Sequence, residues 1–123
     1  MERDTRQRQA IRAALERADR PLSPKEVLSA SRRRVRSLGI ATVYRTLNSL
    51  LEEGWLAEVV LPGEPSRYEV AGKVHHHHFI CEGCDRVFEV HACPGDMKSL
   101  VPEGFAMSRH ELVLYGECAE CAA

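Results

Sequence analysis

Four of the five cysteines in this 123-residue chain form two pairs, each with two residues between its members. The first pair is Cys81 and Cys84, and the second is Cys118 and Cys121. Two intervening residues let both sulfurs of a pair turn toward one ion, and four thiolates make the closed tetrahedral site of structural zinc. Because no position remains for water or a substrate, we expect a structural zinc and no catalytic one.

A single pair of this kind is also compatible with a redox motif or two unrelated core thiols, but two pairs in one chain favour metal. The first residues, MERDTRQRQ, are polar and predict no secretory signal, so we expect a cytoplasmic and reducing location in which a disulfide framework is not favoured. No apolar run approaches the roughly 18 residues that span a bilayer, and we therefore expect no membrane partner.

A run of four histidines lies just before the first cysteine pair. On an extended strand, His76 and His78 point to one face. His75 and His77 then point to the other, so the run predicts two imidazole pairs that can each chelate a metal ion. A chance polar run or the remnant of an affinity tag is disfavoured, because the run is internal and adjoins the cysteines.

The remaining cysteine, Cys93, and the nearby His91 belong to neither pair. Free cysteine often packs as a small apolar residue, so we expect Cys93 to be a half-buried loop residue. The alternative is an additional ligand or a reactive thiol.

The formal net charge of −1 hides an asymmetry along the chain. Residues 1–50 carry 12 Lys and Arg against 5 Asp and Glu, a net charge of +7, whereas the remainder carries 5 against 13, a net charge of −8. The basic part suits phosphates, and the acidic part, which holds every histidine and cysteine, suits cations.

The elements that must position these residues follow from apolar periodicity and helix-start residues. In chain order these are Ile11, Ala14, Leu15 and Ala18; Ser23, Pro24 and Glu26; and Val43, Leu47, Leu50 and Leu51. They predict three helices, the first ended by Pro21 and the third ending before Gly54. Trp55–Leu61 and Ser66–Val70 then predict a β-hairpin, and three helices with a hairpin predict a winged-helix domain over residues 1–72.

After a short linker at 71–73 the composition changes. Three strands are predicted at His77–Cys81, Val87–Val90 and Met107–Tyr115, with a short helix at Pro94–Val101. The prediction for the whole chain is an α+β fold. It consists of the winged-helix domain followed by a small α/β domain, residues 73–123, with a three-stranded antiparallel sheet.

The third predicted helix must turn its apolar stripe to the core, which leaves Thr42, Tyr44, Arg45 and Asn48 toward solvent. Arginine can pair with guanine and a tyrosine ring can pack on a thymine methyl group, so Tyr44 and Arg45 are predicted to contact DNA bases. Contacts with phosphates are expected from Arg6, Arg8, Arg33 and Arg34.

The segments GIATVYRTLNSLLEEGWL, RYEV, HHHHFICEGC, HELVLYGEC and CAEC resemble the ferric uptake regulator family over nearly the whole chain. The resemblance implies a winged-helix DNA-binding domain, a hinge and a dimerisation domain with a four-cysteine zinc. It also implies a homodimeric repressor of metal homeostasis genes, in which a second, exchangeable metal at the hinge closes the dimer onto palindromic, A·T-rich operator DNA.

Carried over by position, the regulatory site of the family falls on Glu69, His76, His78 and Glu89. These ligands suit Fe(II), Zn(II) or Mn(II). A further family site falls on His75, His77 and His110, with Asp96 or Glu103 as the fourth ligand.

The chain also departs from the family pattern. Many iron and peroxide sensors have a histidine ligand where Arg20 and Pro21 stand, many zinc sensors have a cysteine near the hinge, and peroxide sensors tend to use aspartates where this chain has Glu69 and Glu89. An iron or zinc sensor is therefore favoured over a peroxide-sensing member. A zinc enzyme such as a deaminase is not expected, because the motif for an open zinc site is missing. A constitutive, zinc-stabilised DNA-binding or scaffold protein without metal sensing remains the other alternative.

Overall fold

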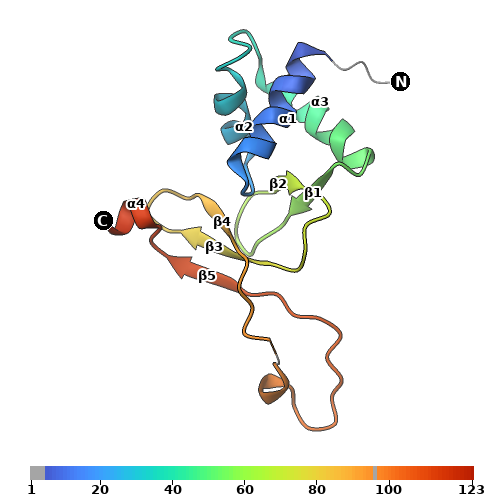
Figure 1. Cartoon of the computed structure of the whole chain (residues 1–123), viewed down its shortest axis with the longest axis vertical. Coiled ribbons are helices and arrows are strands. Elements are labelled where there is room, and N and C mark those ends of the chain that lie inside the picture. Colours follow the sequence, from blue (N-terminus) through green and yellow to red (C-terminus); the bar gives the residue numbers. More distant parts are fainter. Residues whose placement is uncertain (1–4, 96) are drawn as a thin grey trace. The chain divides into compact units, whose positions relative to one another are not determined.

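The computed structural model describes residues 5–95 and 97–123 and divides the chain into two compact units, one ending at Lys73 and one beginning at Val74. The first unit contains three helices and a two-stranded sheet, and the second contains a three-stranded sheet with a long excursion of the chain (Figure 1). Together they make a mixed α+β fold, as predicted. None of the helices in the described ranges has the length and apolar character needed to cross a membrane.

The first unit follows the predicted order of elements. It holds α1 (Arg6–Ala18), α2 (Pro24–Ser31), α3 (Ile40–Glu52), β1 (Leu56–Val59) and β2 (Arg67–Val70). The two strands pair antiparallel, so that they form a hairpin after the third helix. Leu22, between α1 and α2, joins this sheet through two backbone hydrogen bonds of 2.9 Å with Tyr68, which ties the helices to the hairpin.

The predicted apolar stripes form the core of this unit. Ile11 and Leu15 of α1 and Val43, Leu47 and Leu50 of α3 are each at most 1% exposed. Burying a side chain of this size stabilises the fold by about 1.5–3 kcal/mol, so these positions determine how the helices pack. The opposite face of α3 consequently remains in solvent.

The helix ends follow from local chemistry. The hydroxyl of Thr5 accepts the amide of Arg8 at 3.1 Å and so caps α1. Ser23 and Glu26 form the predicted capping box of α2, with the Glu26 amide donating to the Ser23 hydroxyl at 3.2 Å and the Ser23 amide donating to the Glu26 carboxylate at 3.0 Å. After α3 the chain reverses through Gly54, whose φ of +80° is tolerated because glycine has no Cβ.

The sheet of the second unit has the order β4-β3-β5, with β3 (His77–Cys81) in the centre, β4 (Val87–Val90) on one side and β5 (Val113–Gly116) on the other. The predicted all-antiparallel arrangement is wrong, because β3 pairs antiparallel with β4 but parallel with β5. The chain leaves β4 and enters β5 at the same end of the sheet. These two strands therefore run in opposite directions on either side of β3, and β5 is parallel to β3.

The excursion between β4 and β5 contains little regular structure. Among its described residues only a short 3₁₀ turn, η1 (Lys98–Leu100), is present, so the predicted helix at Pro94–Val101 and the predicted strand start at Met107 are wrong. The apolar side chains of Leu100 and Phe105 are 73% and 71% exposed. An apolar pattern forms stable regular structure mainly by packing against a partner, and among the described residues of this segment Leu100 and Phe105 are not packed in this way.

Candidate metal centres and the exposed face of α3

The four paired cysteines converge at one end of the sheet. Cys81 ends β3, and Cys118 follows β5 as the N-cap of a short helix, α4 (Ala119–Ala122), that the sequence did not predict. Because β3 and β5 are parallel and Cys81 lies opposite Gly116, both strands end at the same end of the sheet. Cys84, in the turn after β3, and Cys121, on α4, complete the set.

The spacing of the sulfurs matches a tetrahedral ion site. The Sγ atoms of the four cysteines all lie within 4.8 Å of one another, and those of Cys84 and Cys118 are 3.9 Å apart. Zinc–sulfur bonds of about 2.3 Å at tetrahedral angles separate two sulfurs by about 3.8 Å. Gly83 makes this approach feasible, because a Cβ at this position would lie 3.0 Å from the Cys121 Sγ.

Backbone amides stabilise the thiolate form of one of the four cysteines, Cys81. The amides of Cys118 and Cys84 donate to the Cys81 Sγ at 3.3 and 3.4 Å, and these bonds, that of Cys118 first, lower the pKa of Cys81 to about 6 in spite of its burial. Contacts with the Cys81 and Cys118 sulfurs, together with burial, raise the pKa of Cys121 to about 12. The Arg86 backbone opposes the change at Cys84, but desolvation and the neighbouring sulfurs still raise its pKa. A cation is therefore required for Cys84 and Cys121 to become thiolates near neutral pH.

The histidines of the run alternate in direction as predicted, with His75 and His76 just before β3 and His77 and His78 at its start. The rings of His76 and His78 lie on one face with centroids 4.9 Å apart, and those of His75 and His77 lie on the other with centroids 4.5 Å apart. The chain thus offers two separate imidazole pairs.

The residues that the resemblance assigns to the regulatory site belong to both units. In the second unit, Glu89 of β4 stands directly opposite His78 of β3, and its carboxylate also lies 3.5 Å from the His91 ring. In the first unit, Glu69 lies on β2 opposite Ala57. His78 and Glu89 are thus paired positions of one sheet, and His76 stands just before β3 with its ring beside that of His78.

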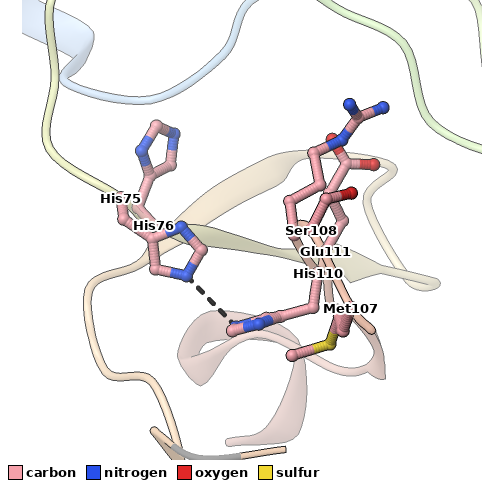
Figure 2. A pocket seen from close by; sticks show the side chains of 7 residues that line it. His75, His76, Met107, Ser108, His110 and Glu111 are labelled. Carbon is pink, nitrogen blue, oxygen red and sulfur yellow. Dashed lines mark hydrogen bonds between the residues drawn. The ribbon is translucent and has the colours of Figure 1, made fainter. Parts of the chain in front are cut away.

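The other histidine face carries a cluster that the sequence predicted only in part. His110, from the segment before β5, turns its Nε2 to 3.3 Å from the Nε2 of His75 (Figure 2). The fourth member of the cluster is Cys93, whose Sγ lies 3.2 Å from the His110 Nε2 and 3.4 Å from the His77 Nε2.

The carboxylates expected in this cluster are not among its described members. Glu103 is exposed and stands apart from the cluster, and Asp96 lies outside the described residues. Cys93 is exposed in its loop, so the expectation of a half-buried apolar residue is wrong.

His77 is the buried member of this cluster, with only 2% of its surface exposed. Burial, followed by the neighbouring histidines, lowers the pKa of His77, so the neutral ring is favoured. The Leu112 amide donates to its Nδ1 at 3.1 Å, and its Nε2 then carries the proton toward Cys93. A cation bound at Nε2 would take the place of that proton, and the neutral ring would then be protonated at Nδ1. Because Nδ1 could no longer accept from the Leu112 amide, one hydrogen bond worth about 1 kcal/mol net would be lost.

The solvent face of α3 carries the side chains predicted to meet DNA. Tyr44 is 49% exposed, and Arg45 and Asn48 are exposed beside it. Thr42 is half-buried and accepts a hydrogen bond of 2.9 Å from the Arg45 guanidinium, which orients that side chain along the helix.

The phosphate contact predicted for Arg8 is wrong. Its side chain is only 9% exposed, forms an ion pair with Glu53 and donates to the Ser49 hydroxyl at 3.1 Å. These contacts connect α1 to the end of α3, so Arg8 is part of the packing of the unit and not free for a phosphate. Arg6, Arg33 and Arg34 are exposed, as a phosphate contact requires.

Comparison with known proteins matches residues 2–115 to the model of the ferric uptake regulator family. The ferric uptake regulation protein of Campylobacter jejuni is 32% identical over 122 residues, which cover 95% of this chain and 78% of that protein. The zinc uptake regulation protein of Mycobacterium tuberculosis is 34% identical over 126 residues, covering 97% and 94%. The solved structure of the Helicobacter pylori ferric uptake regulator, described as having three functional metal binding sites, has a TM-score of 0.72 at 29% identity, covering 98% of this chain and 83% of that one.

Proposed function

This chain belongs to the ferric uptake regulator family, and from that premise we propose that it is a homodimeric repressor whose binding to operator DNA depends on a regulatory metal. The observation that carries the proposal is the combination of an exposed face of α3, which carries Tyr44, Arg45 and Asn48, with ligand clusters beside β3. A metal-responsive regulator needs both parts, and a constitutive DNA-binding protein needs only the first.

The first metal we propose is a structural zinc held by Cys81, Cys84, Cys118 and Cys121. The fit of the sulfur spacing to a tetrahedron and the amides aimed at Cys81 support this assignment. When bound, zinc neutralises the thiolates and ties the ends of β3 and β5 together. Because all four positions are taken by protein, this site would support the fold and would not sense metal.

The regulatory metal is proposed at Glu69, His76, His78 and Glu89. The shared face of His76 and His78, and the position of Glu89 opposite His78, support this set. Imidazole and carboxylate ligands suit Fe(II) or Zn(II), with Mn(II) as the third candidate. At the position where many iron sensors have a further histidine, Arg20 pairs with Glu26 at 3.1 Å, so we propose that this chain uses no ligand there.

The bound metal would act by favouring one arrangement of the two DNA-binding units of the dimer, the one that matches two successive half-sites on a palindromic, A·T-rich operator. Tyr44 and Arg45 would contact bases, with Thr42 and Asn48 beside them, and Arg6, Arg33 and Arg34 would contact phosphates. Since coupling between two sites is reciprocal, metal must bind more tightly when operator DNA is present.

An open strand edge supports the homodimer. Among the described residues, β5 pairs only with β3 in the three-stranded sheet, and its residues Leu114 and Tyr115 are 48% and 54% exposed. An uncovered strand with apolar side chains tends to pair with another chain, and we propose that the partner is a second copy of this one.

The proposal is tested by measuring binding of the zinc-loaded protein to operator DNA under anaerobic conditions. The protein is first treated with EDTA at a concentration that leaves the cysteine-bound zinc in place, and Fe(II), Zn(II) or Mn(II) is then added in turn. We expect weak binding with EDTA and tight binding with one of the ions. Binding that is equally tight under all conditions would instead favour a constitutive DNA-binding or scaffold protein.

A further inference from the structure

We propose that Cys93 supplies a thiolate ligand to a third metal site, whose other ligands are His75, His77 and His110. The site would take a thiolate-preferring divalent ion such as Zn(II). It is independent of the proposed regulatory site, because His76 and His78 lie on the opposite face of β3.

The spacing of the four donor atoms matches one tetrahedral ion. Bonds of about 2.0–2.1 Å to nitrogen and about 2.3 Å to sulfur separate two nitrogens by about 3.3 Å and a nitrogen from a sulfur by about 3.6 Å. The His75 and His110 nitrogens are 3.3 Å apart, and the Cys93 sulfur is 3.2 Å from His110 and 3.4 Å from His77. Three edges of the tetrahedron are therefore close to their required lengths.

The loop that carries Cys93 is shaped to aim its sulfur at the histidines. Pro94 follows the cysteine, and Gly95 then adopts a φ of +87°, which turns the chain back so that its amide lies 3.5 Å from the Cys93 Sγ. This contact holds the sulfur in its direction toward the histidines. The thiolate is the form that binds metal.

The donor set determines the class of ion. Three imidazoles and one thiolate make a closed four-coordinate site that suits Zn(II), whereas Mn(II) prefers oxygen ligands. A carboxylate at the position of Cys93 would make the site more tolerant of oxygen-preferring ions. The thiolate therefore narrows the selectivity of this site toward zinc.

Co(II) is the spectroscopic probe for this assignment, because a thiolate bound to Co(II) gives a charge-transfer band in the near ultraviolet that nitrogen and oxygen ligands do not give. Protein with zinc already held by the four paired cysteines is titrated with Co(II), with its zinc content measured throughout. We expect a band of the intensity of a single thiolate, and Mn(II) should not suppress it. Cys93→Ser should abolish the band and weaken Co(II) binding at this site by more than about 100-fold, since even the loss of an outer partner of a ligand costs about 10–100-fold.

Two variants serve as a matched pair. His110→Ala removes a histidine of the cluster and should abolish the band, whereas His91→Ala removes a nearby exposed histidine outside the cluster and should retain it. A band of undiminished intensity in Cys93→Ser would come from Co(II) bound to other thiolates and would overturn the proposal.

Alkylation provides a second readout that needs no coloured ion. Zinc should slow the reaction of Cys93 with iodoacetamide by at least about tenfold, and His110→Ala should remove most of this protection. Peptide mass spectrometry separates Cys93 from the other four cysteines. An unchanged alkylation rate with and without zinc would also overturn the proposal.

Discussion

The affinity of the four-cysteine site for zinc should fall steeply as the pH is lowered, because at least two of its thiols must lose a proton when zinc binds. The pKa of Cys81 is lowered to about 6, so near pH 7 this sulfur is mostly ionised before zinc arrives. The pKa values of Cys84 and Cys121 are raised, that of Cys121 to about 12, so each of these thiols must release a proton when zinc binds. Binding that releases protons becomes stronger as the pH rises.

The magnitude follows from the count of protons. Release of at least two protons makes the apparent zinc affinity change by at least about 100-fold per pH unit near pH 7, or about 2.7 kcal/mol. Below about pH 6, where Cys81 is also protonated, a further proton is released and the slope should increase to at least about 1000-fold per pH unit.

The assay is competition with a chromophoric chelator at constant ionic strength, with the proton dependence of the chelator measured separately. Less than one equivalent of zinc is used, in the Cys93→Ser variant, so that the paired cysteines are the only thiol ligands. A change in zinc affinity of about tenfold or less per pH unit, which corresponds to the release of one proton or fewer, would refute this description of the cluster.

Three further outcomes are expected. Arg45→Ala should reduce discrimination between operator and random DNA by about 1–3 kcal/mol in a binding assay, and equal losses on both sequences would refute a base contact. Arg8→Ala should lower the free energy of unfolding in urea by about 1–3 kcal/mol, because the contacts with Ser49 and Glu53 are lost. The control Arg6→Ala should change this free energy by less than about 0.5 kcal/mol. Similar values for the two variants would contradict the packing role of Arg8. Gly83→Ala should speed the loss of zinc to a chelator, since the added Cβ would meet the Cys121 sulfur at 3.0 Å, and unchanged retention would argue against this close packing.

Short-range patterns in the sequence predicted much of the local structure. The capping box at Ser23 and Glu26 forms as expected, and the apolar stripe of α3 is buried while Tyr44 and Arg45 remain outside. The strands at His77–Cys81 and Val87–Val90 have the predicted bounds. These features depend on neighbours within a few residues, which a sequence displays directly.

Features that depend on distant partners were missed. Arg8 was predicted to contact a phosphate, but it pairs with Glu53, which lies 45 residues further along the chain. The parallel pairing of β5 with β3 depends on which side of the sheet the chain enters, and apolar alternation carries no information on strand order. This parallel pairing brings the two cysteine pairs together at one end of the sheet.

A ligand role for Cys93 was only the alternative prediction, for a related reason. A single cysteine outside a pair gives no spacing signal, and only the return of the chain before β5 brings His110 beside it. The signal available in the sequence was the Cys-Pro-Gly turn, which fixes the direction of a side chain but does not identify what it faces.

The central claim is that metal at the histidine face of His76 and His78 controls DNA binding while the cysteine-bound zinc does not. It is tested most directly by the His76→Ala/His78→Ala double variant, purified with zinc in the four-cysteine site and titrated with operator DNA by fluorescence anisotropy, with and without added regulatory metal. We expect the variant to keep this zinc and its thermal stability, and to bind operator weakly whether or not metal is added, whereas the wild-type protein binds tightly only with metal. A variant that responds to added metal as the wild-type protein does would contradict the account.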